Sequence, residues 1–121
     1  MLYAVLCYNA EEVVTAWTQE EDDAVMARLD VVHQRLIDAG KFGPAARLMP
    51  TTAATTLRKS DGAVLDGPYA ETKEQLLGLY IIDVADLEEG LAVARDLTAA
   101  NPGGAYELRP LRLFLPGVLD Q

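Results

Sequence analysis

The residue types best suited to chemistry gather in one polar segment, residues 66–74, which reads Asp-Gly-Pro-Tyr-Ala-Glu-Thr-Lys-Glu. The carboxylates of Asp66, Glu71 and Glu74 can accept or donate protons. The ammonium group of Lys73 can stabilise an anion or an enolate. We therefore predict that this segment contributes to a functional site. Its predicted catalytic residues are Asp66, Glu71 and Lys73, and its predicted ligand-binding residues are Tyr69 and Glu74.

A structural interpretation stands beside the functional one. Asp66 precedes Gly67-Pro68, and an aspartate in that position often caps its own turn. The charged side chains that follow form only a solvated ion-pair cluster if the segment is exposed, and such clusters contribute little stability. Tyr69 can be either an aromatic wall or a hydroxyl donor. The functional interpretation requires that the segment cover a cleft.

Two further candidates lie on predicted secondary structure. His33, the only histidine, lies beside an apolar helical stripe, and Asp30 is the nearest acid on that helix. Such a pair can orient an imidazole as a catalytic general base; the alternative is a half-buried histidine with one satisfied nitrogen. Arg109 shares its strand face with Glu107, so it is either half of a surface ion pair or a ligand-binding fork for a carboxylate.

Composition narrows the classes of protein. The chain has 121 residues, half of them hydrophobic, which fits a single domain spanning residues 1–121. A net charge of -9 argues against binding to nucleic acid and against binding to an anionic membrane surface. One cysteine and one histidine cannot form a structural zinc site, and the sequence has no glycine-rich phosphate loop or Gly-x-Ser-x-Gly motif. We predict no metal, no cofactor and a cytoplasmic location.

The elements that must position these residues are predicted from hydrophobic periodicity. Residues 2–8 and 76–84 are apolar on both alternating faces, which indicates buried strands. Helices are expected after the capping box at residues 18–21 and after Asp86, with Gly40 ending the first. Strands are also predicted at 51–59, at 63–65 after a Ser-Asp-Gly turn, and at 106–115, whereas 9–18 and 41–50 are predicted to be connections.

The order β-α-β-(β-hairpin)-β-α-β is the ferredoxin-like plan of the α+β class. In that plan the first and third main strands are central, and the last strand, which contains Pro110, lies at an edge. Two helices cover only one face of such a sheet. Because strands 2–8 and 76–84 are apolar on both faces, we predict a homodimer packed through the open sheet face.

Residues 66–78, from Asp-Gly-Pro-Tyr to Leu-Leu-Gly, resemble the DGPF motif of YCII-related proteins, with Tyr69 in place of phenylalanine. Residues 54–58, 80–84 and 106–111 resemble neighbouring segments of that family, so the resemblance covers most of the chain. It implies a dimeric α/β barrel of ferredoxin-like subunits. The histidine of YciI-type relatives, part of a suspected His–Asp pair, lies ahead of an Ala-Arg-Leu run, where this chain has Met26.

Two functions follow, and whether the protein is an enzyme stays open. The first is a small dimeric protein that binds or transforms a small organic molecule by acid/base chemistry, of isomerase or lyase type. The second is a non-catalytic regulatory module linked to transcription without DNA contact, since relatives of this family are often encoded beside alternative sigma factors. An enclosed apolar pocket with a shifted pKa at Asp66, His33 or Lys73 favours the first function, and a solvated segment 66–74 favours the second.

Overall fold

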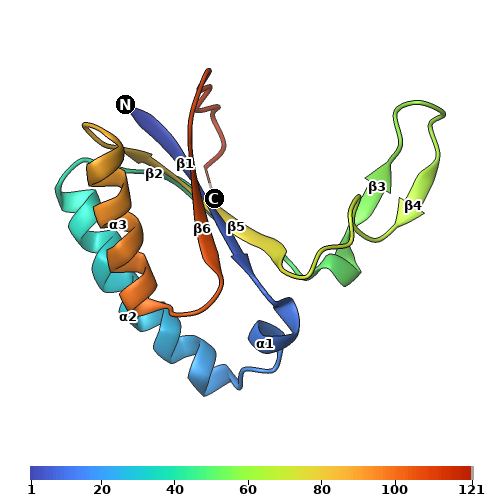
Figure 1. Cartoon of the computed structure of the whole chain (residues 1–121), viewed down its shortest axis with the longest axis horizontal. Coiled ribbons are helices and arrows are strands. Elements are labelled where there is room, and N and C mark those ends of the chain that lie inside the picture. Colours follow the sequence, from blue (N-terminus) through green and yellow to red (C-terminus); the bar gives the residue numbers. More distant parts are fainter. Residues whose placement is uncertain (121) are drawn as a thin grey trace.

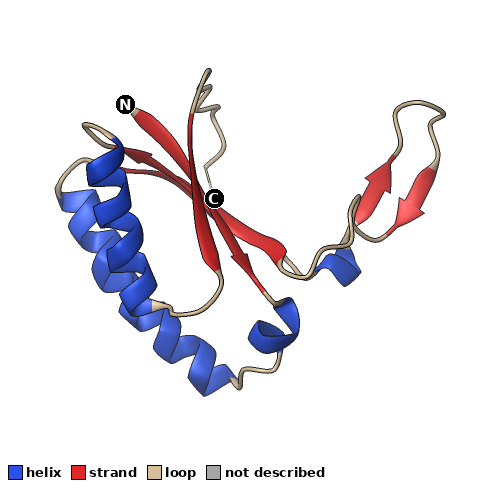
Figure 2. Cartoon of the chain, in the orientation of Figure 1, coloured by secondary structure: helices blue, strands red, loops and turns tan. Residues whose placement is uncertain are grey.

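The computed structural model describes residues 1–120 and has an antiparallel sheet of four strands, with two long helices on one of its faces (Figure 1). A separate two-stranded hairpin, which lies between the second and third strands of this sheet in the sequence, projects away from it (Figure 2). The elements in chain order are β1 (Leu2–Asn9), α1 (Glu11–Thr15), α2 (Gln19–Asp38), β2 (Phe42–Arg47), a 3-10 turn (Thr51–Ala53), β3 (Thr55–Leu57), β4 (Val64–Asp66), β5 (Gln75–Asp83), α3 (Leu87–Ala100) and β6 (Ala105–Pro110).

The main sheet has the strand order β2-β5-β1-β6, and all its pairs are antiparallel. β1 and β5 are central, as their two-sided apolar sequences predict, and β6 lies at an edge, as Pro110 requires. This is the strand order of the predicted ferredoxin-like plan, so the α+β class is confirmed. The order places β5 between β1 and β2, which α2 connects.

The second edge strand corrects the sequence prediction. It is β2, within the segment predicted as a connection, whereas 51–59 contributes only a 3-10 turn and the short β3. The pairing of β2 with β5 shifts register between Phe42 and Ala45, so Gly43 and Pro44 are accommodated in an irregularity of the ladder. Gly43 is required there, because an added Cβ would lie 2.6 Å from the carbonyl oxygen of Ile81.

The core lies between the sheet and the two long helices. Val5 and Ile82, from the central strands, are fully buried, as is Leu97 of α3. The predicted stripe of α2 faces them; its buried residues are Val25, Leu29, Val32 and Leu36. Gly90 of α3 packs closely against the sheet, since a Cβ there would meet the side chain of Leu108 at 3.1 Å. Burial of these apolar side chains is the main stabilising force.

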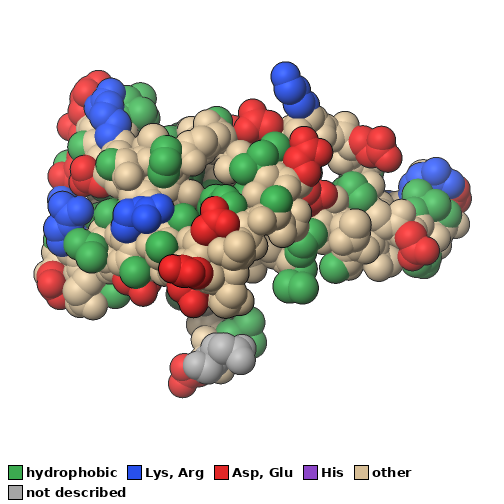
Figure 3. All heavy atoms as spheres, turned by 90° about the horizontal axis from the view of Figure 1, so that it is seen from below, with side chains coloured by type: hydrophobic (Ala, Val, Ile, Leu, Met, Phe, Trp, Pro, Cys, Tyr) green, Lys and Arg blue, Asp and Glu red, His purple; other side chains and the backbone are tan. Residues whose placement is uncertain are grey.

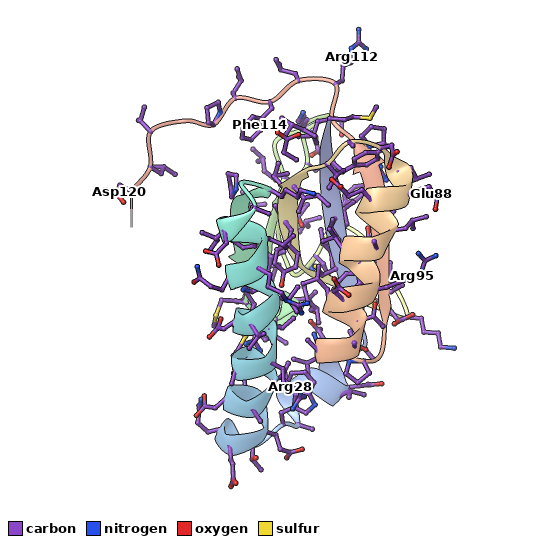
Figure 4. The ribbon with its side chains drawn as sticks, turned by 90° about the vertical axis from the view of Figure 1, so that its left-hand side faces the viewer. Arg28, Glu88, Arg95, Arg112, Phe114 and Asp120 are labelled. Atoms are coloured by element: carbon purple, nitrogen blue, oxygen red, sulfur yellow. The ribbon has the colours of Figure 1, made fainter. Side chains whose placement is uncertain are left out.

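The ends of the helices follow the predicted capping chemistry. The hydroxyl of Thr18 accepts from the N–H of Glu21, whose carboxylate accepts from the N–H of Thr18, which completes the capping box. The carboxylate of Asp86 caps α3 by accepting from the N–H of Glu89, whose own carboxylate accepts from the N–H of Ala85. Arg28 reaches from α2 to the end of α3 and donates to the carbonyl of Ala100, as its position between the helices in Figure 4 shows. α1 was not predicted and lies within a segment expected to be a loop.

The sheet face opposite the helices carries no helix of the described chain (Figure 1). Two segments extend from the body on Figure 3: the arm (residues 54–67, containing β3 and β4) and the tail (residues 111–120). Both display apolar side chains to solvent; the most exposed are Leu57, Val64, Leu113, Leu115, Val118 and Leu119. Among residues 1–120, no helix combines the length and the apolar character that crossing a membrane demands.

Candidate functional site

A cavity of about 510 Å³ lies between α2 and the sheet, on the side where α1 closes the open end of the core. Its walls come from α1, α2, the ends of β1 and β2, and the middle of β5. Most of its lining is apolar; examples are Val14, Trp17, Met26, Leu29, Met49 and Leu79. Its volume is in the range of sites that hold small organic ligands. Trp17, the only tryptophan, lies on this wall, so its fluorescence can report on the cavity.

The polar centre of the cavity wall is a hydrogen-bonded pair from α2 and β5. Nε2 of His33 lies 2.8 Å from the hydroxyl oxygen of Tyr80. The imidazole and phenol rings meet nearly edge to face, with centroids 5.2 Å apart, and Phe42 packs against both. The strand places Tyr80 on the same face as the buried Ile82, and the helix directs His33 inward beside Leu29.

Burial keeps both members of this pair neutral. Desolvation lowers the pKa of His33, and the Asp30 carboxylate, 3.8 Å from Nδ1, opposes this only in part. Desolvation also raises the pKa of the Tyr80 hydroxyl well above its usual range. The carboxylate beside Nδ1 favours a proton on that nitrogen, which leaves Nε2 free to accept the hydrogen bond from Tyr80.

Cys7 lies on the floor of the same cavity, in the predicted apolar run. Burial raises the pKa of its thiol to about 12, so almost no thiolate exists at neutral pH. We expect native protein at pH 8 to react with iodoacetamide more than ~10-fold more slowly than protein unfolded in urea, because the thiolate is the reactive form. Mass spectrometry of the alkylated chain measures both rates. Equal rates in the two states would contradict the buried position of Cys7.

The charged side chains on the cavity wall lie at its mouth. Arg47, at the end of β2, binds both carboxylate oxygens of Asp22 in the first turn of α2, at 2.6 and 3.3 Å. This pairing lowers the pKa of Asp22. The carboxylate of Glu11 accepts hydrogen bonds from both the N–H and the hydroxyl of Thr51, which lowers its pKa. Glu11 is thereby engaged in holding α1 against the turn after β2.

Of the seven predicted site residues, His33 alone lines this cavity; Asp66, Tyr69, Glu71, Lys73, Glu74 and Arg109 do not. Segment 66–74 is exposed except for the half-buried Gly67, and the Tyr69 side chain is 90% exposed. Lys73 borders a second, more open hollow beside Glu11 and Glu12. Asp66 ends β4, where it pairs with Thr55. Their catalytic and binding roles stay predictions.

Arg109 pairs with Glu107 on β6, with Nε 3.0 Å from the carboxylate oxygen. These residues oppose Ala4 and Leu6 in the ladder, which places them on the sheet face without helices. This geometry matches the first of the two interpretations of Arg109, the surface ion pair. Within residues 1–120, no group of three or more His, Cys, Asp or Glu side chains is placed to hold a metal ion.

A pocket between helix and sheet was one of two positions that the sequence suggested, the other being the dimer cleft, but the sequence interpretation missed Tyr80 and Arg47. A signal for Tyr80 is present, because it shares its strand face with Ile82, a residue of the strongest apolar run. A hydroxyl on a buried strand face needs a hydrogen-bond partner, and His33, the only histidine of the sequence, is directed inward from α2. Arg47 carries no comparable signal, since its strand was not predicted.

The fold and the cavity define the class: a small ferredoxin-like α+β protein with a ligand-sized, mostly apolar cavity between helix and sheet. The chain belongs to the YCII-related family, whose domain model matches residues 1–115. It is 62% identical over 122 residues to an uncharacterized protein, R00369, of Rhizobium meliloti (strain 1021), a match that covers 98% of each chain. The family resemblance predicted from segment 66–78 is confirmed.

Proposed function

We propose that this protein binds a small, largely apolar organic molecule in the cavity and removes a proton from a hydroxyl group of that molecule. The observation that carries the proposal is the neutral His33–Tyr80 pair, 2.8 Å apart, on the wall of a cavity of about 510 Å³. A desolvated acid/base pair in an apolar cavity is a frequent property of active sites. A tautomerase, which is a type of isomerase, uses this chemistry on enols.

The proton path follows from the preferred tautomer. The Tyr80 hydroxyl donates to Nε2 of His33, so its oxygen lone pairs are available to a ligand hydroxyl. An enol passes its proton to the Tyr80 oxygen as the Tyr80 proton moves to Nε2, which leaves an enolate and an imidazolium. Asp30, 3.8 Å from Nδ1 and mostly exposed, stabilises the imidazolium. The enolate carbon then takes up a proton from water, and the imidazolium returns its own to solvent.

The test is deuterium uptake at the benzylic carbon of methyl phenylpyruvate, an uncharged α-keto ester that forms an enol, followed by NMR in deuterium oxide. We expect the protein to accelerate uptake, and Tyr80→Phe to lower the rate by ~100-fold or more, the usual size of an acid/base contribution. The rate should stay level above about pH 6.5 and fall in more acidic solution, because the base must be unprotonated and burial keeps the pKa of His33 below its ordinary value.

Tyr106→Phe is the matched control. Tyr106 also lines the cavity, burial raises the pKa of its hydroxyl to about 12, and the loss of one hydroxyl is identical, but its partner is Asn101 rather than a histidine. This variant should retain most of the rate. An equal loss in the two variants, or no acceleration by the native protein, would contradict the proposed proton path.

We further propose that two copies pack through the sheet faces that carry no helix. The support is the apolar content of that face, which includes Leu6 and Ile81, and the exposed apolar side chains of the arm and tail. Light scattering at micromolar concentration measures the mass of the particle in solution; a monomer mass would contradict the dimer.

A solvated segment 66–74 also fits the alternative function, a non-catalytic module that contacts a regulatory protein.

A further inference from the structure

We infer that the ligand of the cavity is a carboxylic acid, held at the mouth by Arg47 and presenting a hydroxyl or enol to Tyr80 at the other end. This inference rests on the proposed function and specifies its substrate class. Among the described residues that line the cavity, Arg47 is the only lysine or arginine. The only carboxylate on that wall, Glu11, already accepts two hydrogen bonds from Thr51.

Arg47 has donors to spare for a ligand. Its guanidinium group carries five N–H donors in a rigid fork, and the two contacts to Asp22 use only part of that fork. Its side chain is 51% exposed, so the remaining donors are accessible to a molecule that enters through the mouth. Because Asp22 holds one side of the group, the guanidinium is positioned before the ligand arrives, which reduces the entropy lost on binding.

The spacing of the two polar ends indicates the length of the ligand. Arg47 pairs with Gly78 in the ladder, and Tyr80 lies two residues further along the same strand face, a distance of about 7 Å. On the opposite wall, Asp22 and His33 are eleven residues apart on α2, about 16 Å along the helix axis. A planar molecule of one or two rings, with its acid and hydroxyl groups at opposite ends, has a length between these two values, and it would lie against the apolar side chains of Met26 and Leu29.

Isothermal titration calorimetry of 6-hydroxy-2-naphthoic acid and its uncharged carboxamide tests the inference without any turnover. We expect the native protein to bind the acid ~10- to 100-fold more tightly, which is the usual strength of a charge-assisted hydrogen bond. Arg47→Gln should abolish this preference and leave the affinity for the carboxamide unchanged, which also shows that the cavity is intact. Arg47→Lys, which keeps the charge but loses the fork, should retain part of the preference.

Arg58→Gln is the matched control, because it removes one positive charge from the same acidic chain. Arg58 lies on the arm, is paired with Asp61, and is 52% exposed, nearly the same as Arg47. The Arg58→Gln variant should prefer the acid over the carboxamide as strongly as the native protein does. Equal binding of the two compounds, or the same loss in both arginine variants, would overturn the ligand class while the cavity remains a binding site. Failure of both compounds to bind the native protein would contradict the proposed cavity site itself.

Discussion

Replacing Gly104 with alanine is expected to lower the free energy of unfolding by more than ~2 kcal/mol, since two independent costs combine at this residue. Gly104 has φ of +72°, a conformation that alanine adopts only with strain, and a Cβ built on it would lie 2.0 Å from the carbonyl oxygen of Tyr8. Backbone atoms cannot move aside as a flexible side chain can. The clash therefore separates the start of β6 from β1, at the point where Ala105 of β6 pairs with Tyr8 of β1.

Gly40→Ala is the control that separates the two costs. Gly40 has nearly the same φ, +71°, but no heavy atom lies within 4 Å of the position of its added Cβ. It should therefore show only the conformational cost, about 1–2 kcal/mol. Urea unfolding followed by circular dichroism measures both variants. A Gly104 variant no less stable than the Gly40 variant would contradict the close approach of the two strands.

Truncating Ile82 to alanine should cost about 2–5 kcal/mol, the range for deleting a large buried aliphatic side chain. Ile82 is fully buried at the centre of the core, between β1, β5 and the long helices. The cavity left behind is surrounded by elements on all sides, which limits how far the core can collapse into it. The loss should appear as a lower urea midpoint than that of the native chain when both are measured at the same protein concentration.

Ile81→Ala is the comparison on the adjacent residue of the same strand. Its side chain points to the sheet face without helices, because successive side chains of a strand alternate. If two copies pack through that face, this variant should weaken the dimer, and light scattering should show dissociation at a higher protein concentration than for the native chain. A dimer unaffected by Ile81→Ala would contradict sheet-to-sheet packing, whatever the result for Ile82.

The central strands and long helices could be predicted because their signals are local. Residues 2–8 and 76–84 are apolar on both faces, and the capping box at Thr18 marks the start of α2. β2 could not be predicted in this way. Its residues Gly43 and Pro44 normally interrupt a strand, and they are tolerated because β2 lies at an edge and shifts register there. Tertiary pairing with β5 overrides the local preference.

The candidate site was only partly accessible to sequence reasoning for a related reason. The helical period directs His33 inward, so its half-buried position beside Asp30 could be predicted. Its partner Tyr80 is 47 residues away, and nothing in the sequence fixes the alignment of α2 over β5 that joins them. The residue types of the charged segment 66–74 indicate reactivity, but the exposure of a side chain decides whether its charged group is desolvated.

The arm has a further consequence for how this sequence can change. β3 and β4 pair only with each other, outside the four-stranded sheet, so substitutions at their solvent-facing positions leave the ladder of the body intact. Contacts made by the arm can therefore diversify without eroding the stability of the domain that carries it. Among related proteins, sequence differences that change the binding partner should accumulate first on this hairpin. The helix-facing side of the sheet stays under the constraint of close packing.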